Sequence, residues 1–311
     1  MCNVPNALFT QLFVDGEMLS AFSGETKAYY RALNFKYGTN RRNVVWQSGA
    51  GKKVELNTEK FASYDNHHLL VMRYSFKALN KGTYKLITGI DGRVWSINGE
   101  HFKSYKPFDN EGLVGLKMKT IELGTEVVVT EGIKLNGASP KSSGILEEDK
   151  RILREYVFEL ESEEEVFFEK VVSITHNNEI EHLLEMAKEE VKNGLEQGYA
   201  SLKSVHQQKW DEIWRISDIQ IAGNLEAQVL ARFNIYQAII ATPKHANLPI
   251  GARGLSCQVY QGAAFWDQET FNLPMFIYTQ PDLARNLVTY RHDTLNGARR
   301  KAKKLGYDGA F

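Results

Sequence analysis

The chain has 311 residues, of which 43% are hydrophobic and 24% are charged, which is typical of a globular protein with about two domains. Its 38 Lys and Arg residues balance 38 Asp and Glu residues, so it lacks the cationic excess of a nucleic-acid-binding protein. No apolar stretch is long enough for a membrane span, and two cysteines cannot form a disulfide framework, so we expect a cytoplasmic protein with no nucleic-acid or membrane partner.

Residues 1–175 are predicted to form an N-terminal antiparallel β-sandwich. Runs of β-branched and aromatic residues separated by turn signals, with no helical period between them, favour many short strands. The clearest runs are Asn43–Trp46, His68–Phe76, Glu126–Thr130 and Glu165–Val172. The polar stretch Asn136–Gly144 is expected to be a surface loop, and the acidic run Glu161–Glu165 a solvated turn or strand edge.

Residues 176–222 are predicted to be a helical linker. Apolar residues fall on one helical face after an Asn177-Asn178 cap, namely Ile180, Leu183, Leu184, Ala187 and Val191. Gly194 is expected to weaken this helix before a second one that carries Val205 to Trp214. His206 is interpreted as a packed or surface histidine, because no His or Cys stands at metal-ligand spacing from it.

Residues 223–311 are predicted to be mainly helical. A first helix carries a stripe of Val229, Phe233, Tyr236 and Ile240, and a loop from Pro243 to Tyr260 follows. Pro281 opens the next helix, whose inward positions are expected to be Leu283, Ala284, Leu287 and Val288. A further helix is expected from Leu295 to Leu305, with Gly306 just past its end.

The segment Phe265–Glu269 carries the clearest functional pattern. Trp266 and Asp267 place an aromatic ring beside a carboxylate, which suits a sugar pocket: the ring covers the C–H face of a pyranose and the carboxylate accepts hydrogen bonds from hydroxyls. The alternative is that Trp266 is a core aromatic and Asp267 a helix N-cap. Asp267 and Glu269 are too close in sequence to flank a scissile bond, so a catalytic pair is not favoured.

Almost the whole chain resembles glycoside hydrolase family 65, the maltose, trehalose and kojibiose phosphorylases. The residues that carry the resemblance include Ala252–Leu255, Tyr260, Gly262, Phe265–Glu269, Ala284–Leu287, Tyr290-Arg291, Gly297–Arg299 and Gly306-Tyr307. Many members have a His after the glycine, where this chain has Gly262-Ala263-Ala264. The resemblance implies that residues 223–311 are the first helices of an incomplete (α/α)6 barrel, and that the chain is an internal fragment of a larger enzyme.

The resemblance implies inverting phosphorolysis of an α-glucoside to β-glucose 1-phosphate. An enzymic carboxylic acid protonates the leaving oxygen while inorganic phosphate attacks the anomeric carbon. The implied partners are the α-glucoside and phosphate as co-substrate, with no metal or organic cofactor, and the resemblance allows a homodimeric parent enzyme. The general-acid glutamate is expected beyond Phe311, so no catalytic residue is assigned here and the chain alone is expected to be inactive.

By the same resemblance, Trp266 and Asp267 belong to the glucose-binding subsite, with Tyr260, Arg253 and Glu269 as further candidates. Glu269 is expected to brace the loop, and Arg253 to pair with it or with Asp267. Three segments resemble the kojibiose and glucosylglycerol type more than the maltose type, namely Ser256–Gln258, Gly262–Ala264 and Asp91–Trp95. An α-glucoside hydrolase of the same fold and a non-catalytic carbohydrate-binding protein remain open as alternatives.

Overall fold

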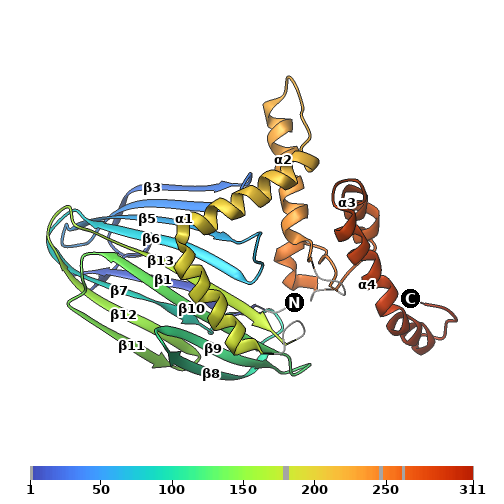
Figure 1. Cartoon of the computed structure of the whole chain (residues 1–311), viewed down its shortest axis with the longest axis horizontal. Helices are drawn as coiled ribbons and strands as arrows, with labels where there is room; N and C mark the ends of the chain where they lie inside the picture. Colours follow the sequence, from blue (N-terminus) through green and yellow to red (C-terminus); the bar gives the residue numbers. More distant parts are fainter. Residues whose placement is uncertain (1–2, 178–181, 245–247, 261–262, 311) are drawn as a thin grey trace. The chain divides into compact units, whose positions relative to one another are not determined.

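The computed structural model describes residues 3–177, 182–244, 248–260 and 263–310, and the chain divides into two compact units between Asp211 and Glu212 (Figure 1). The strands of the first unit are β1 (Asn6–Val14), β2 (Glu17–Met18), β3 (Glu25–Asn34), β4 (Thr39–Gln47), β5 (Lys53–Ala62), β6 (Leu69–Ala78), β7 (Gly82–Asp91), β8 (Phe102–Asn110), β9 (Leu113–Thr120), β10 (Glu126–Gly137), β11 (Ser142–Glu148), β12 (Arg151–Leu160) and β13 (Glu165–His176). The helices are α1 (Leu183–Ser217), α2 (Leu225–Ala241), a 3₁₀ helix (Gly254–Tyr260), a π-helical turn (Gln268–Asn272), α3 (Leu273–Thr279) and α4 (Pro281–Lys304).

The strands form two antiparallel sheets. One sheet has five strands in the order β11-β12-β7-β1-β2, and the other has eight in the order β3-β4-β5-β6-β13-β10-β9-β8. The described neighbouring strands pair antiparallel throughout, for example Leu12 with Leu86 and Val171 with Val71. The β-sandwich expected from the sequence is therefore confirmed, and each of the four clearest strand predictions lies in or largely overlaps an observed strand.

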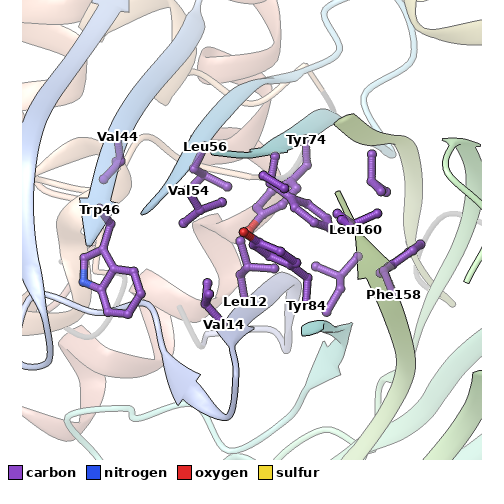
Figure 2. Close-up of a cluster of buried hydrophobic side chains, with 14 of the residues drawn as sticks. Leu12, Val14, Val44, Trp46, Val54, Leu56, Tyr74, Tyr84, Phe158 and Leu160 are labelled. Carbon is purple, nitrogen blue, oxygen red and sulfur yellow. The ribbon is translucent and has the colours of Figure 1, made fainter. Parts of the chain in front are cut away.

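The core lies between the two sheets, where alternate side chains of each strand face one another. Figure 2 shows Leu12, Tyr84 and Phe158 of the five-stranded sheet pointing toward side chains of the eight-stranded sheet. Trp46 is fully buried there and its indole nitrogen donates to the Ser23 carbonyl oxygen at 2.8 Å. Apolar burial on this scale, at about 25 cal/mol per Å², is the main force that holds the sandwich together.

One connection between strands is shorter than the sequence predicted. The expected loop Asn136–Gly144 is mostly strand, because β10 runs to Gly137 and β11 begins at Ser142. Gly137 permits this because its φ of 90° turns the chain in a conformation that few side chains tolerate. The acidic run is a turn between β12 and β13, as predicted, with Glu161 to Glu164 exposed to solvent.

The first part of α1 packs on the outer face of the eight-stranded sheet instead of only linking two domains. Val191, Tyr199 and Leu202 of the helix share a buried cluster with residues of the sheet such as Val71 and Val171. Figure 1 shows the helix lying across these strands. The expected cap at Asn178 and the apolar residue Ile180 lie outside the described residues.

The break in this helix falls at Gly198 and not at Gly194, which corrects the sequence prediction. Gly198 has φ 77° and ψ 160°, so two helical segments meet there. Gly194 keeps the helical conformation, and a Cβ on it would lie 2.8 Å from Cγ1 of Val171. Gly194 therefore allows close approach of helix and sheet, whereas Gly198 provides the turn.

His206 is a packed histidine, as predicted. It is 1% exposed and stacks on the Phe61 ring with the centroids 4.5 Å apart. Its Nδ1 accepts a hydrogen bond from the Tyr64 amide at 3.0 Å, and its Nε2 lies 2.5 Å from the Tyr37 carbonyl oxygen. Burial lowers the pKa of His206, against an opposing effect of the hydrogen bond to Tyr37.

The second unit is helical, as expected, but its buried faces differ from the predicted stripes. On α2 the buried residues are Ile235, Tyr236 and Ile239, while Val229 and Phe233 are exposed. On α4, Leu283, Ala284 and Leu287 are buried as predicted and Val288 is 52% exposed. Helical period alone predicts an apolar stripe, but its edges depend on which neighbours cover them.

The helix expected from Leu295 to Leu305 is the second half of α4 and not a separate element. Gly297 does not interrupt it, because a single helical glycine costs only about 1 kcal/mol relative to alanine. Gly306, with φ 83°, follows the C-cap residue Leu305, so the predicted end is confirmed. None of the described helices combines the length and the apolar character that crossing a bilayer requires.

Candidate functional site

Trp266 and Asp267 stand at the entrance of the π-helical turn that precedes α3. The Trp266 side chain is 70% exposed, and so is that of Phe271, with the two ring centroids 6.5 Å apart. Tyr260 and Phe265 form a second aromatic pair, edge to face at 5.4 Å. Trp266 is therefore not a core aromatic, and its ring is available to cover a flat apolar face.

Asp267 is not a capping residue of the kind considered from the sequence. It precedes the π-helical turn with φ −51° and ψ −35°, which is already helical, and its carboxylate makes no capping hydrogen bond. An N-cap residue would instead have extended backbone and accept a bond from an amide two or three residues on. The exposed carboxylate of Asp267 is thus not used to end a helix, which leaves its oxygens to accept bonds from a ligand.

Glu269 is the best-fixed carboxylate of this segment, and its partner is Arg291 of α4. The guanidinium holds it with two bonds of 2.9 Å, from Nε to Oε1 and from Nη2 to Oε2. Nη2 also donates to the Phe265 carbonyl oxygen at 2.8 Å. Burial would raise the pKa of the Glu269 carboxyl, but the bonds from Arg291 and Gln268 outweigh it and lower the pKa. Glu269 braces the turn as expected, but its carboxylate pairs with Arg291, and among the described residues Arg253 pairs neither with Glu269 nor with Asp267.

Gln268 connects this turn to two other elements. Its side chain is buried, and its Oε1 accepts a hydrogen bond of 2.7 Å from the Ile250 amide. Its Nε2 donates to Glu269 at 2.6 Å and to the Leu287 carbonyl oxygen at 3.4 Å. The loop before the motif, the π-helical turn and α4 are therefore held as one piece directly behind Trp266 and Asp267.

Gln268 and Arg291 were not assigned a role from the sequence. Both belong to segments that carry the family resemblance, which was the one available signal. Arg291 is 22 positions from Glu269, and nothing in that spacing distinguishes it from the closer Arg253. The bidentate geometry selects Arg291, since a planar guanidinium matches both carboxylate oxygens at once.

Arg253 lines a neighbouring cleft of about 520 Å³ between the end of α2 and the 3₁₀ helix. Asn234 and Gln237 of α2 face Gly251, Ser256 and Asn272 across it. Trp266, Asp267, Tyr260 and Glu269 do not line this cleft. Of the predicted site residues, Trp266 and Asp267 therefore lie together, and Tyr260 lies beside Phe265. Glu269 instead pairs with Arg291 of α4, and Arg253 lines the neighbouring cleft.

The described residues of the site offer polar and aromatic groups. Within the described parts of the chain, no three His, Cys, Asp or Glu residues gather in a way that could hold a metal ion. Gly262 lies outside the described residues, but Ala263, which stands where many family members have a His, is described, and its amide donates to the Tyr260 carbonyl oxygen at 2.9 Å. The chemistry that the described groups support is hydrogen bonding and ring stacking.

Comparisons with known proteins agree with this picture. The model of the glycosyl hydrolase family 65 N-terminal domain matches residues 1–213, and that of the family 65 central catalytic domain matches residues 232–311. A 1,2-alpha-glucosylglycerol phosphorylase of Bacillus selenitireducens is 41% identical over all of this chain and 40% of its own length. A nigerose phosphorylase of Lachnoclostridium phytofermentans is 33% identical over 99% of this chain and 44% of its own length.

A solved structure has the same fold. It is a protein from the human microbiome that carries the provisional name kojibiose phosphorylase, with a TM-score of 0.90 at 23% identity. The match covers 99% of this chain and 41% of the other. The chain therefore spans well under half the length of the relatives to which it is similar.

Proposed function

Because the chain belongs to glycosyl hydrolase family 65, we propose that it is part of an inverting phosphorylase that converts an α-glucoside and phosphate to β-glucose 1-phosphate. The relatives named above are phosphorylases, and their high coverage of this chain supports the assignment. Phosphate would attack the anomeric carbon from the face opposite the departing oxygen, which a general acid protonates. None of the residues proposed here supplies that acid.

Within this reaction, Trp266 and Asp267 would form part of the glucose-binding subsite. The observation that carries this proposal is that the exposed ring of Trp266 and the carboxylate of Asp267, which caps no helix, stand side by side in the sequence. The turn that they precede is held in place by Gln268 and by the Glu269–Arg291 pair. Such bracing keeps the binding groups aligned before the sugar arrives, which lowers the cost of orienting them in the transition state. Tyr260 and Arg253 would contribute from the neighbouring positions.

We propose a 1,2-linked glucoside as the substrate, of the kojibiose or glucosylglycerol type. The glucosylglycerol phosphorylase is 41% identical to this chain, and a kojibiose phosphorylase of Halothermothrix orenii is 33% identical. A maltose phosphorylase of Bacillus subtilis is 30% identical. The nigerose phosphorylase is as similar as this kojibiose phosphorylase, at 33%, so it is the identity to the glucosylglycerol phosphorylase that supports the choice, which a comparison of substrates can test directly.

The test uses the longer enzyme of which this chain is proposed to be a part. We expect release of β-glucose 1-phosphate from glucosylglycerol or kojibiose in phosphate buffer, with the anomer read by NMR. Free glucose released at equal rates with and without phosphate would instead identify a hydrolase. Faster turnover of maltose than of both 1,2-linked substrates would contradict the substrate proposal alone.

In the same enzyme, Asp267→Asn is expected to lower kcat/KM about ten- to a hundredfold, because a charge-assisted hydrogen bond is worth about 1.5–3 kcal/mol. Thermal unfolding should change little, since the carboxylate caps no helix. Asp282→Asn serves as the matched control, because it makes the same change in the first turn of α4. Equal activity of the two variants would remove Asp267 from the sugar subsite.

A further inference from the structure

Three basic side chains gather on the inner face of the eight-stranded sheet, close to its edge strand β3. Arg42 of β4 and Lys60 of β5 lie on the face of their strands that carries Val44 and Leu56, which belong to the core (Figure 2). Arg31 of β3 pairs with Arg42 in the strand register and therefore lies on the same face. Arg31, Arg42 and Lys60 together form the inner basic cluster.

The strand register brings these three cations close together. Arg31 and Arg42 are directly opposite each other, where Cβ atoms lie about 4.5–5.5 Å apart. Thr58 is opposite Arg42, so Lys60, two residues further along β5, is a diagonal neighbour of Arg42. Burial lowers the pKa of Lys60, and the positive charges of Arg31 and Arg42 lower it further. Like charges at such positions repel, so the arrangement is destabilising unless negative charge offsets it.

The protein itself does not offset this charge within the part of the chain that the structure describes. There, none of the three side chains forms an ion pair or a hydrogen bond, and the Nε atom of Arg42 is buried without a partner. Arg41, which faces the other side of the sheet, is by contrast paired with Glu59. A buried N–H group without a partner is costly, and a bound ion is one of the few ways to satisfy it.

The chemistry of the cluster fits a phosphate group. A phosphate group carries up to two negative charges and several strong acceptor oxygens, whereas a carboxylate would offset only one of the three positive charges. A guanidinium can bond two phosphate oxygens at once, and Lys60 adds a point charge beside it. The hydroxyl of Thr58, on the same face, can donate as well.

We propose that the inner basic cluster binds a phosphate group, supplied either by inorganic phosphate or by a sugar phosphate. Its residues belong to the β-sandwich, whereas Trp266 and Asp267 belong to the helical unit. The anion would neutralise the cluster and accept the bond that the buried Nε–H of Arg42 lacks. The β-sandwich would thereby gain stability from the ligand, independently of the proposed function of the glucose subsite.

The test is a titration of the 311-residue chain, followed by NMR of the Arg42 Nε–H group, at an ionic strength kept constant with chloride. The ligands are inorganic phosphate, glucose 1-phosphate, acetate and glucose. Both phosphates should shift the Arg42 signal saturably with a roughly millimolar dissociation constant, the weak end of small-ligand binding, and glucose should not. Tighter binding of glucose 1-phosphate would support the sugar phosphate as the source, and equal or tighter binding of inorganic phosphate would support the free ion.

Arg42→Gln and Arg73→Gln provide a matched pair, because both remove one arginine charge from the same sheet. Arg73 pairs with Glu59 in the register of β6 and β5, so it lies on the outer face. Binding is measured from the rise of the melting temperature with phosphate concentration. Arg42→Gln should weaken it about ten- to a hundredfold, the usual effect of losing a hydrogen bond from a charged donor, and Arg73→Gln should leave it nearly unchanged.

Lys60→Met distinguishes a binding role from a purely structural one, because Met keeps most of the aliphatic stem. Without phosphate, the variant should melt no lower than the wild type, since it loses repulsion from Arg31 and Arg42. With phosphate at saturation, it should melt below the wild type because it binds the anion less well. Equal losses under both conditions would mean that Lys60 only packs.

Three further results would overturn the proposal. An Arg42 signal that does not move at high phosphate would show that no anion binds there. Equal weakening by Arg42→Gln and Arg73→Gln would show general attraction of anions to a positive surface. Saturation by acetate at least as tight as by phosphate would make the cluster a carboxylate site.

Discussion

Gln268→Ala tests whether the turn behind Trp266 and Asp267 is held as one piece. Gln268 is 2% exposed and Ile250 is 5% exposed. Within the described residues, the only hydrogen bond found from the Ile250 amide goes to the Gln268 side chain, at 2.7 Å. The alanine variant leaves that buried N–H without a partner, which costs about 1–3 kcal/mol. Loss of the bond to Glu269 and of packing brings the expected destabilisation to about 2–4 kcal/mol.

The assay is hydrogen exchange of the Ile250 amide together with urea unfolding of the helical unit. Protection of Ile250 should fall by roughly tenfold or more, since every 1.4 kcal/mol corresponds to a factor of ten. Gln237→Ala is the control, because Gln237 is exposed on α2 and should change stability by no more than about 0.5 kcal/mol. Unchanged exchange at Ile250 would refute the argument that Gln268 fixes this loop.

Two further predictions concern the charged groups of the two units. Lys170→Met should destabilise the sandwich by about 3–5 kcal/mol in chemical denaturation, because among the described residues buried Glu131 then keeps only its ion pair with Arg154. Adding Glu131→Leu should recover much of the loss, and a single variant as stable as the double would contradict this. The pKa of Glu269 is lowered in the folded state from its ordinary value of 4.5. The Glu269 carboxylate should therefore contribute fully to stability above pH 4.5, and this contribution should be lost as the pH falls from 4.5 through the lowered pKa of the folded state. Glu269→Gln should therefore narrow the gap between stability at neutral and at acidic pH, and an unchanged pH profile would show that the pair with Arg291 contributes nothing.

Much of the first unit was determined by the sequence itself. A strand buried on one face alternates apolar and polar residues, so runs such as His68–Phe76 identify strands without knowledge of their partners. The turn at Glu161–Glu164 and the end of α4 at Gly306 could likewise be predicted, because the residues at these positions themselves favour the backbone conformation of a turn or a helix end. Membership of the family also followed from the sequence, because its residues recur in order along almost the whole chain.

The tertiary structure alone decided which residues meet. Gly194 and Gly198 have the same side chain, and only the approach of Val171 shows that one allows packing while the other breaks the helix. Glu269 had a nearby arginine in sequence, yet α4 brings Arg291 into bidentate geometry with it. Periodicity and local propensity describe one element at a time, whereas burial, ion pairing and the exposure of Trp266 depend on what a neighbouring element covers.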